Sequence, residues 1–178
     1  MAIRKIARMG HPVLLQVSNA IADPGSPEVA ALLQDMEETL EDIEGLGIAA
    51  PQVYEPVRIV IFHAPLDDSV NFGSREELRQ TPLTRIVNPE WEPIGEEQVE
   101  RWESCLSVPG MRGRVRRPEK IRYVGVTPEG KIIDRRVDGY HARVVQHEID
   151  HLDGFLYPMR MDDMKTFMFE TEFERHRR

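Results

Sequence analysis

The sequence has one cysteine, Cys105, and no long apolar segment. A single cysteine excludes an internal disulfide framework, so the thiol is buried filler, a nucleophile or a metal ligand. No apolar run approaches the roughly 20 residues that a membrane helix needs, so we expect no membrane association. The N-terminus lacks the apolar core and cleavage site of a signal peptide and is too poor in Ser and Arg for a transit peptide, so we expect a cytoplasmic protein.

Positive charge is also scarce, because the formal net charge is -8 at pH 7. Binding to nucleic-acid phosphates needs clustered Lys and Arg, so this balance argues against direct sequence-specific nucleic-acid binding. Two basic patches occur, at residues 112–117 and 175–178. We expect a solvated loop and a frayed end there. The alternative is local steering toward an anionic partner such as a peptide C-terminus or ribosomal RNA.

No internal repeat or low-complexity stretch divides the chain, and 178 residues fit one domain, 1–178. Apolar spacing predicts helices at 26–43, 139–151 and 162–174. Strands are predicted at 56–62, 83–88, 121–126 and 131–137, the last two forming a hairpin, and a long loop with one helical turn at 74–79 is predicted over 67–82. This order predicts an α+β fold, with antiparallel strands packed around a central helix and further helices toward both ends.

The central predicted helix carries the segment His147-Glu148-Ile149-Asp150-His151. Histidines at i and i+4 lie on one helical face, about 5–6 Å apart at Cβ, so both imidazoles can bind one metal ion. Glu148 projects just off that face, where a general base can reach a water molecule. The alternative is a pair of surface histidines, but this helix is apolar on more than one side, which is typical of a buried helix. Buried and unpartnered, these polar groups would be costly, so the pattern favours a metal site.

Two histidines leave a tetrahedral catalytic ion one protein ligand short. The candidates for the third ligand are Cys105, Asp153, His141, His63 and several glutamates. Thiolate is a strong ligand for Zn²⁺ or Fe²⁺, which favours Cys105. A small buried hydrophobe and a cysteine nucleophile remain the alternatives for this residue, although a nucleophile leaves the paired histidines unexplained.

The segment Gly45-Leu-Gly-Ile-Ala-Ala-Pro-Gln-Val lets the backbone approach a ligand closely. A helix C-cap followed by a turn explains its glycines equally well. Gln52, however, is a polar amide among small and apolar neighbours. It indicates a donor aimed at a specific group, such as a developing oxyanion.

Taken together, three segments resemble the peptide deformylase family in order and spacing. The family motif GxGxAAxQ matches GLGIAAPQ at Gly45–Gln52, EGCxS matches ESCLS at Glu103–Ser107, and QHExDHLxG matches QHEIDHLDG at Gln146–Gly154. The likeness extends from about residue 5 to about residue 160. Residues 139–147 also resemble the subclass that includes organellar deformylases and their bacterial relatives.

This resemblance implies a role for each matching residue. Cys105, His147 and His151 would bind one divalent metal ion, Fe²⁺ in the cell, with Zn²⁺, Ni²⁺ or Co²⁺ also found in the family. Glu148 would move a proton from water to the leaving amine, and Gln52 and the backbone N–H of Leu106 would hold the oxyanion. Substrate contacts would come from Gly45, Gly47, Tyr140, Arg143 and Val144. The substrate would be N-formylmethionyl nascent chains, at the ribosome, and the products formate and a free N-terminus.

Three residues depart from the family pattern. Ser104 replaces the usual glycine before the cysteine, so its φ must suit a Cβ. Arg143 and Arg101 stand where some deformylases have aliphatic residues around the methionine pocket. Either their stems line the pocket wall with the guanidinium groups at its rim, or they are surface or ion-paired arginines.

Two other functions compete with this interpretation. A zinc endopeptidase uses the same helix motif, with Asp153 or the glutamates at 170, 172 and 174 as third ligand, but Cys105 would then have no task. A non-catalytic metal-stabilised module is the second. The sequence leaves open the metal, and whether the protein is a monomer or a homodimer. It also leaves open whether the apolar face of the last predicted helix packs on the domain or contacts a partner.

Overall fold

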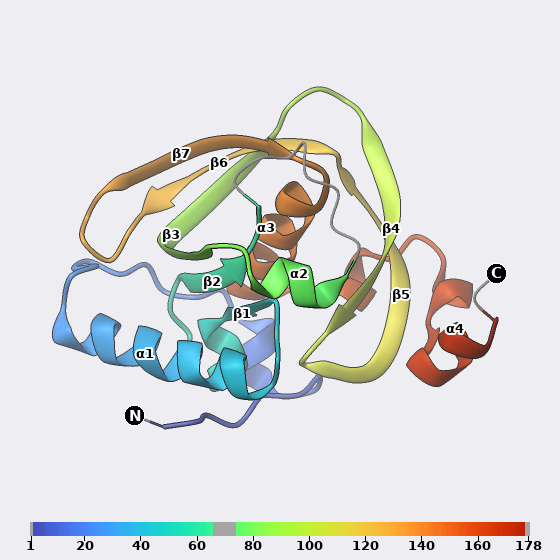
Figure 1. Cartoon of the computed structure of the whole chain (residues 1–178), viewed down its shortest axis with the longest axis horizontal. Helices are drawn as coiled ribbons and strands as arrows, with labels where there is room; N and C mark the ends of the chain where they lie inside the picture. The colour runs from blue at the N-terminus through green and yellow to red at the C-terminus, as the bar shows by residue number, and fades with distance from the viewer. Residues whose placement is uncertain (1, 66–73, 177–178) are drawn as a thin grey trace.

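The structure is a computed structural model that describes residues 2–65 and 74–176. Within these residues the strands form two antiparallel sheets (Figure 1). The five-stranded sheet has the order β1 (Gly47–Ala49), β2 (Ile59–His63), β3 (Leu83–Pro93), β6 (Lys120–Val126), β7 (Ile132–Asp138). The three-stranded sheet of the described residues has the order β4 (Gln98–Cys105), β5 (Val108–Pro118), β8 (Met168–Phe169).

The helices lie on both faces of the larger sheet and at the end of the chain. The α-helices are α1 (Pro27–Asp42), α2 (Arg75–Arg79), α3 (Gly139–Leu152) and α4 (Glu170–His176), and the 3-10 helices are η1 (Pro12–Leu15), η2 (Ala50–Val53), η3 (Tyr157–Arg160) and η4 (Met164–Thr166). The predicted fold class is confirmed: the protein is α+β, with antiparallel strands around a central helix and helices toward both ends. None of the described helices is long and apolar enough to cross a membrane.

Helix α1 covers one face of the five-stranded sheet. Its start follows from the sequence, because the hydroxyl of Ser26 accepts a hydrogen bond from the N–H of Val29 and Pro27 occupies the first turn. The buried residues of α1 recur at helical spacing and pack on β1 and β2, in a core cluster that includes Leu33, Met36, Leu40, Ile48, Ile59 and Ile61.

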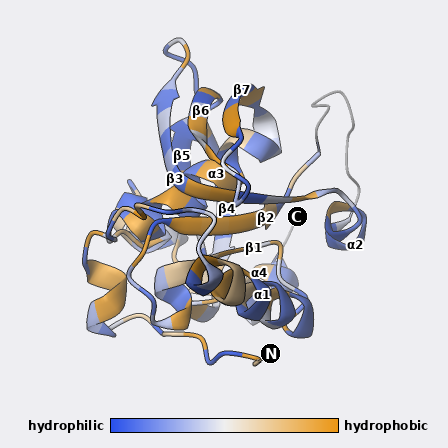
Figure 2. Cartoon of the chain, turned by 90° about the vertical axis from the view of Figure 1, so that its left-hand side faces the viewer, coloured by the Kyte–Doolittle hydropathy of each residue, from blue (hydrophilic) through white to orange (hydrophobic). Residues whose placement is uncertain are grey.

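Strand β2 is buried on both faces, since α3 covers the face opposite to α1. Successive side chains of a strand point to opposite faces. Ile59 and Ile61 accordingly belong to the cluster under α1, whereas Val60 and Phe62 belong to the cluster that contains Ile149 of α3. Figure 2 shows β2 as a hydrophobic ribbon at the centre of the molecule. Helix α3 also contacts β5 of the smaller sheet, so it lies between the two sheets.

Two sequence predictions are wrong at the smaller sheet. Residues 112–117 are not a solvated loop but part of β5, which pairs with β4 and β8. This strand was not predicted because two of its inward positions hold Gly113 and Arg117, and only Val115 between them is apolar. The alternation of apolar and polar residues that marks a strand is therefore missing. Each arginine of this stretch forms an ion pair: Arg112 with Glu170, Arg114 with Glu100, Arg116 with Asp162, and Arg117 with Glu103 and Asp150.

The predicted helix over 162–174 is also wrong for most of its length. The chain forms the short 3-10 helix η4, then β8, and becomes α-helical only in α4. Met168 and Phe169 pair with Arg112 and Met111 of β5, and strand pairing at this sheet edge outweighs the helical apolar spacing. Phe173 of α4 packs against Trp102 with ring centroids 4.8 Å apart, so this segment packs on the rest of the chain.

Smaller differences concern the region between β2 and β4. Strand β3 continues to Pro93 where the sequence predicted an end at residue 88, and a register shift between Val87 and Glu90 accommodates Asn88 and Pro89. Asn88 has a φ of 51°, in the left-handed region. The helical turn predicted at 74–79 is confirmed as α2. Two further segments lie outside the described residues: residues 66–73, where the predicted loop begins, and residues 177–178.

Candidate active site

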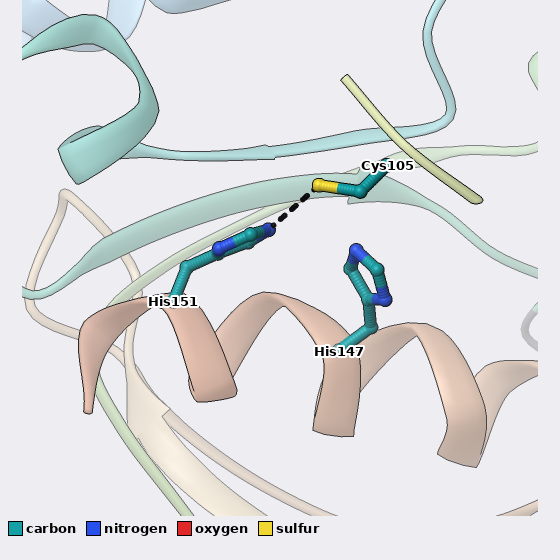
Figure 3. Close-up of side chains that lie close together, drawn as sticks. All are labelled: Cys105, His147 and His151. Carbon is teal, nitrogen blue, oxygen red and sulfur yellow. Dashed lines mark hydrogen bonds between the residues drawn. The ribbon is translucent and has the colours of Figure 1, made fainter. Parts of the chain in front are cut away.

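Three side chains from two elements meet between the sheets. Cys105 is the last residue of β4, and His147 and His151 lie one turn apart on α3. Figure 3 shows the three side chains pointing toward one another. Their candidate ligand atoms all lie within 4.8 Å of one another, and the Sγ of Cys105 is 3.3 Å from the Nε2 of His151. Two imidazoles and a thiol at this spacing fit a single Zn²⁺ or Fe²⁺ ion.

Cys105 has the properties of a metal ligand. Burial would raise the pKa of its thiol, but the imidazoles of His151 and His147 outweigh burial and hold that pKa well below its usual value. The thiolate, which is the ligand form, is therefore favoured. Ser104 does not disturb this arrangement, because its side chain is exposed in β4 and its φ is not positive.

The other residues considered as third ligand are engaged elsewhere. Asp153 accepts a hydrogen bond from Arg58 at 2.7 Å, and the Nδ1 of His63 lies 2.8 Å from the carbonyl oxygen of Thr81. His141 lies between the hydroxyl of Tyr123, at 3.0 Å, and the carbonyl oxygen of Pro65, at 2.9 Å. Of the described candidates, Cys105 is the one that forms a cluster with both histidines in which all ligand atoms lie within 4.8 Å of one another.

Glu148 is a buried carboxyl group beside these three residues. Burial raises the pKa of Glu148 to about 7, against the opposing effect of His147 and His151. Its Oε2 atom has no hydrogen-bond partner among the described residues. A buried acceptor with a pKa near neutrality can both take and release a proton, which is what a general base and acid must do.

Gln52 lies in η2 with its amide held in one orientation. Its Oε1 accepts the N–H of Ala49 at 2.9 Å, and its Nε2 donates to the Oγ of Ser107 at 3.1 Å. The same Nε2 is 3.5 Å from the Sγ of Cys105. The amide N–H₂ therefore lies beside Cys105, where a fixed donor can stabilise developing negative charge. Leu106 follows Cys105 directly and lines the same cavity.

A cavity of about 570 Å³ opens beside these residues. Of the residues expected to contact substrate, four line it: Gly47, Tyr140, Arg143 and Val144. Gly45 does not line it, because it packs against Leu40 at the end of α1 and leaves no room there for a Cβ. The position of Gly45 therefore gives no support to the expectation that it contacts substrate. Arg101 lies at the cavity and pairs with Glu119 at 3.3 Å.

Glu103, to which the sequence pattern assigned no role, is a buried carboxylate that contacts His147. The Oε2 of Glu103 lies 2.8 Å from the Nδ1 of His147. Arg117 donates to both oxygens of Glu103, at 2.6 and 2.9 Å, and also to Asp150 at 2.8 Å. Burial alone would raise the pKa of Glu103, but Arg117 and His147 hold it well below its usual range. A signal was present: two residues apart on one strand, Glu103 and Cys105 share a face.

A hydrogen bond from the second ring nitrogen is the usual support of a metal-binding histidine, because it fixes the tautomer and the ring orientation. With the Nδ1 of His147 bonded to Glu103, its Nε2 remains available to a metal ion. The donor set of the site therefore fits a divalent metal in composition, spacing and orientation.

Comparison with known proteins identifies the family. Residues 3–167 match the family model described as polypeptide deformylase. The chain belongs to the polypeptide deformylase family. "Peptide deformylase 1" of Nitrosomonas europaea is 46% identical over 165 residues, which cover 93% of this chain and 91% of that protein. "Peptide deformylase 1" of Xanthomonas campestris pv. campestris is 42% identical, with 94% and 95% covered.

Solved deformylase structures share the fold. A class I type b peptide deformylase from Acinetobacter baumannii with Met-Ala-Ser bound has a TM-score of 0.78 at 30% identity, covering 90% of this chain and all of that one (100%). The peptide deformylase from Thermotoga maritima has a TM-score of 0.77 at 27% identity, covering 92% and 100%. The resemblance of the three motifs is thereby confirmed, and the chain is a hydrolase acting on N-formylmethionine peptides.

Proposed function

We propose that this deformylase is metal-dependent and removes the N-formyl group from the N-terminal formyl-methionine of newly synthesised polypeptides, releasing formate. We further propose that residues 1–178 act as one catalytic domain. The observation that carries the proposal is the meeting of Cys105, His147 and His151 beside Glu148 at a cavity large enough for a peptide terminus. Ribosomes present formylated chains in the bacterial cytoplasm, so the reaction would take place there.

The three candidate ligands would hold one divalent ion. When bound, the ion would supply Lewis-acid polarisation of the formyl oxygen and would acidify a water molecule. Imidazole and thiolate suit both Fe²⁺ and Zn²⁺. We propose Fe²⁺ as the ion in the cell, as the family resemblance implies, with Zn²⁺, Ni²⁺ or Co²⁺ as substitutes. A site of iron and thiolate is sensitive to oxidation, so the metal content should be measured after anaerobic purification.

In this reaction Glu148 takes a proton from the attacking water and gives it to the leaving amine. A pKa raised to about 7 by burial suits both transfers. The amide of Gln52 donates to the oxygen that becomes negative as water adds to the formyl carbon, and the backbone N–H of Leu106 is proposed as the second donor. The carbon–nitrogen bond then breaks, and formate and the free amino terminus leave.

The peptide is proposed to bind along β1, the edge strand of the larger sheet. An edge strand can pair through its backbone with an extended peptide, and Gly47 lies on this strand at the cavity. Tyr140 and Val144, with the stem of Arg143, would receive the first side chain of the substrate. The relative from A. baumannii solved with Met-Ala-Ser supports this assignment, because that peptide begins with methionine.

The proposal is tested by assaying formate release from formyl-Met-Ala-Ser beside a casein-cleavage assay. We expect formate release and intact casein. Cleaved casein with the formyl peptide untouched would instead support the zinc endopeptidase.

A second test changes the base. Glu148→Ala should lower kcat by about 10²- to 10⁴-fold, which is the usual contribution of general-base catalysis. Its metal content, measured by elemental analysis, should stay at the wild-type level. A non-catalytic metal-stabilised module would tolerate this substitution without loss of function.

A further inference from the structure

Arg143 is an interior arginine, one helical turn before His147 on α3. Arg143 lines the cavity but is only 8% exposed. Nη1 donates to the Oε1 of Glu103 at 2.7 Å and to the carbonyl oxygen of Val115 at 3.1 Å, and Nη2 donates to the carbonyl oxygen of Val99 at 2.7 Å. A buried guanidinium is costly unless its donors are paired. Nη1 and Nη2 are paired by these three contacts, whereas Nε has no hydrogen-bond partner among the described residues.

The carboxylate of Glu103 receives four hydrogen bonds. Arg143 Nη1 and Arg117 Nε share Oε1, whereas Arg117 Nη2 and His147 Nδ1 share Oε2. With both oxygens engaged, the carboxylate cannot rotate without breaking a bond. The two arginines therefore hold the carboxylate of Glu103 in the orientation that meets the Nδ1 of His147.

Arg143 also joins two elements that carry candidate ligands. Val99 belongs to β4 and Val115 to β5, the two strands of the hairpin on which Cys105 lies. Arg143 itself belongs to α3, which carries both histidines. Its hydrogen bonds thus fasten the thiol-bearing hairpin to the histidine-bearing helix. Arg117 of β5 makes a second link to α3 through Asp150, but it donates to neither of the two strand carbonyls that Arg143 contacts.

We propose that Arg143 is a positioning residue of the metal site: through Glu103 it sets the ring of His147, and through β4 and β5 it sets the distance of Cys105 from α3. This inference rests on the proposed metal-dependent function. It assigns the guanidinium a task separate from the pocket wall, to which only the rest of the side chain contributes.

The experiment compares Arg143→Met and Arg143→Lys with wild type and with a matched control, Arg58→Met. Arg58 is similarly buried, with 15% of its side chain exposed against 10% for Arg143. It donates to one carboxylate and one backbone carbonyl, whereas Arg143 donates to one carboxylate and two backbone carbonyls. Its partners are Asp153 and Pro89, and it does not contact Glu103.

The first readout is the rate at which each protein loaded with Zn²⁺ releases the ion to excess chelator. Changes to the residues that support metal ligands typically cost about 10- to 100-fold in affinity, so we expect release from Arg143→Met to be about tenfold faster than from wild type. Arg143→Lys keeps the positive charge but not the forked donors of the guanidinium, so its zinc-release rate should lie between those of wild type and Arg143→Met. Arg58→Met should release the ion at the wild-type rate. Release from both Arg143 variants at the wild-type rate would overturn the proposal.

The second readout separates positioning from substrate contact. A positioning role predicts a fall in kcat for formyl-Met-Ala-Ser with KM changed by less than about threefold. A raised KM with unchanged kcat and unchanged zinc release would make Arg143 a substrate contact and overturn the inference. If Arg143→Met does not fold, the zinc-release rate and the kinetics of Arg143→Lys test the proposal instead. If wild type binds zinc but does not hydrolyse the formyl peptide, the proposed function fails, while the release rates still test Arg143.

Discussion

Gly47 of β1 lies directly against the carboxylate of Glu148, so closely that a Cβ at residue 47 would overlap Oε1. The φ of Gly47 is not in the left-handed region, so the backbone conformation does not require glycine there. Space alone requires it. The missing side chain is what allows the edge strand and the candidate base to lie side by side at the cavity.

Gly47→Ala is therefore expected to displace the Glu148 carboxylate without affecting the three candidate ligands. The kcat for a formyl-methionyl peptide should fall about 10²-fold or more, because misplacing a general base removes most of its contribution. Metal content should stay at the wild-type level. The control is Gly25→Ala, where an added Cβ makes only ordinary contacts. Unchanged kcat in Gly47→Ala would show that Glu148 does not act from its present position.

Gln52→Leu tests the proposed oxyanion donor. Loss of one such donor typically costs about 10²–10³ in kcat, and we expect a fall of this size with little change in KM. Ser107→Ala removes a hydrogen-bond partner of Gln52 but keeps the amide, so its effect should be below about tenfold. Equal losses in the two variants would mean that Gln52 acts by packing and not as a donor.

Metal removal should lower the thermal stability of the protein. A ligand that binds only the folded state at about 100 times its Kd adds about 2.7 kcal/mol, which raises the Tm of a chain of this length by roughly 5–10 °C. Melting curves with Zn²⁺ and with chelator measure the difference. Cys105→Ser should lose most of it, because the hydroxyl is a poor replacement for a thiolate ligand. A full zinc-dependent rise in Cys105→Ser would exclude the thiol from the ligand set.

His141 gives the protein a dependence of stability on pH that is separate from the site. Burial lowers the pKa of His141 to about 4, against the opposing hydrogen bond to Pro65. The unfolded chain, with a histidine pKa near 6.5, takes up the proton first as the pH falls. The stability that depends on neutral His141 is complete above about pH 6.5 and is lost between about 6.5 and 4.

Urea unfolding at about pH 7.5 and about pH 5, with chelator present, measures this loss. The pKa difference predicts that neutral His141 accounts for a loss of about 2 kcal/mol in the free energy of unfolding of wild type. His141→Gln should lose correspondingly less on the same change of pH, whatever its absolute stability. The exposed residue His11 provides the control, as His11→Gln. Equal losses in wild type and His141→Gln would contradict the assignment.

The helix motif could be found from sequence because it is local: His147 and His151 lie on one element at a spacing that the helix itself sets. The contacts of Glu103 could not be found in that way. Its partners Arg117 and Arg143 lie 14 and 40 residues away, and only the folded hairpin brings the three together. From the sequence alone, charged residues in such numbers are interpreted as solvated.

The missed strands have a related cause. Pattern recognition needs apolar residues at inward positions, and β4 and β5 bury Glu103 and Arg117 instead. At the C-terminus the apolar spacing of residues 162–174 favoured a helix. Met168 and Phe169 form a strand because they pair with the edge of β5. That edge lies more than 50 residues earlier in the chain, so the local apolar pattern does not reveal the pairing.

The place of α3 between the two sheets has a consequence for how the enzyme is made. The strands of both sheets, apart from β8, precede α3 in the chain, so they leave the ribosome before the helix that covers them. Until residue 152 has emerged, the apolar faces that later pack on α3 have nothing to cover them, and such surfaces aggregate readily. The candidate ligand set is also incomplete until then, because His147 and His151 follow Cys105 in the chain. Metal acquisition is therefore a late event in the biosynthesis of this chain, and fragments that end before α3 should neither load metal nor stay in solution.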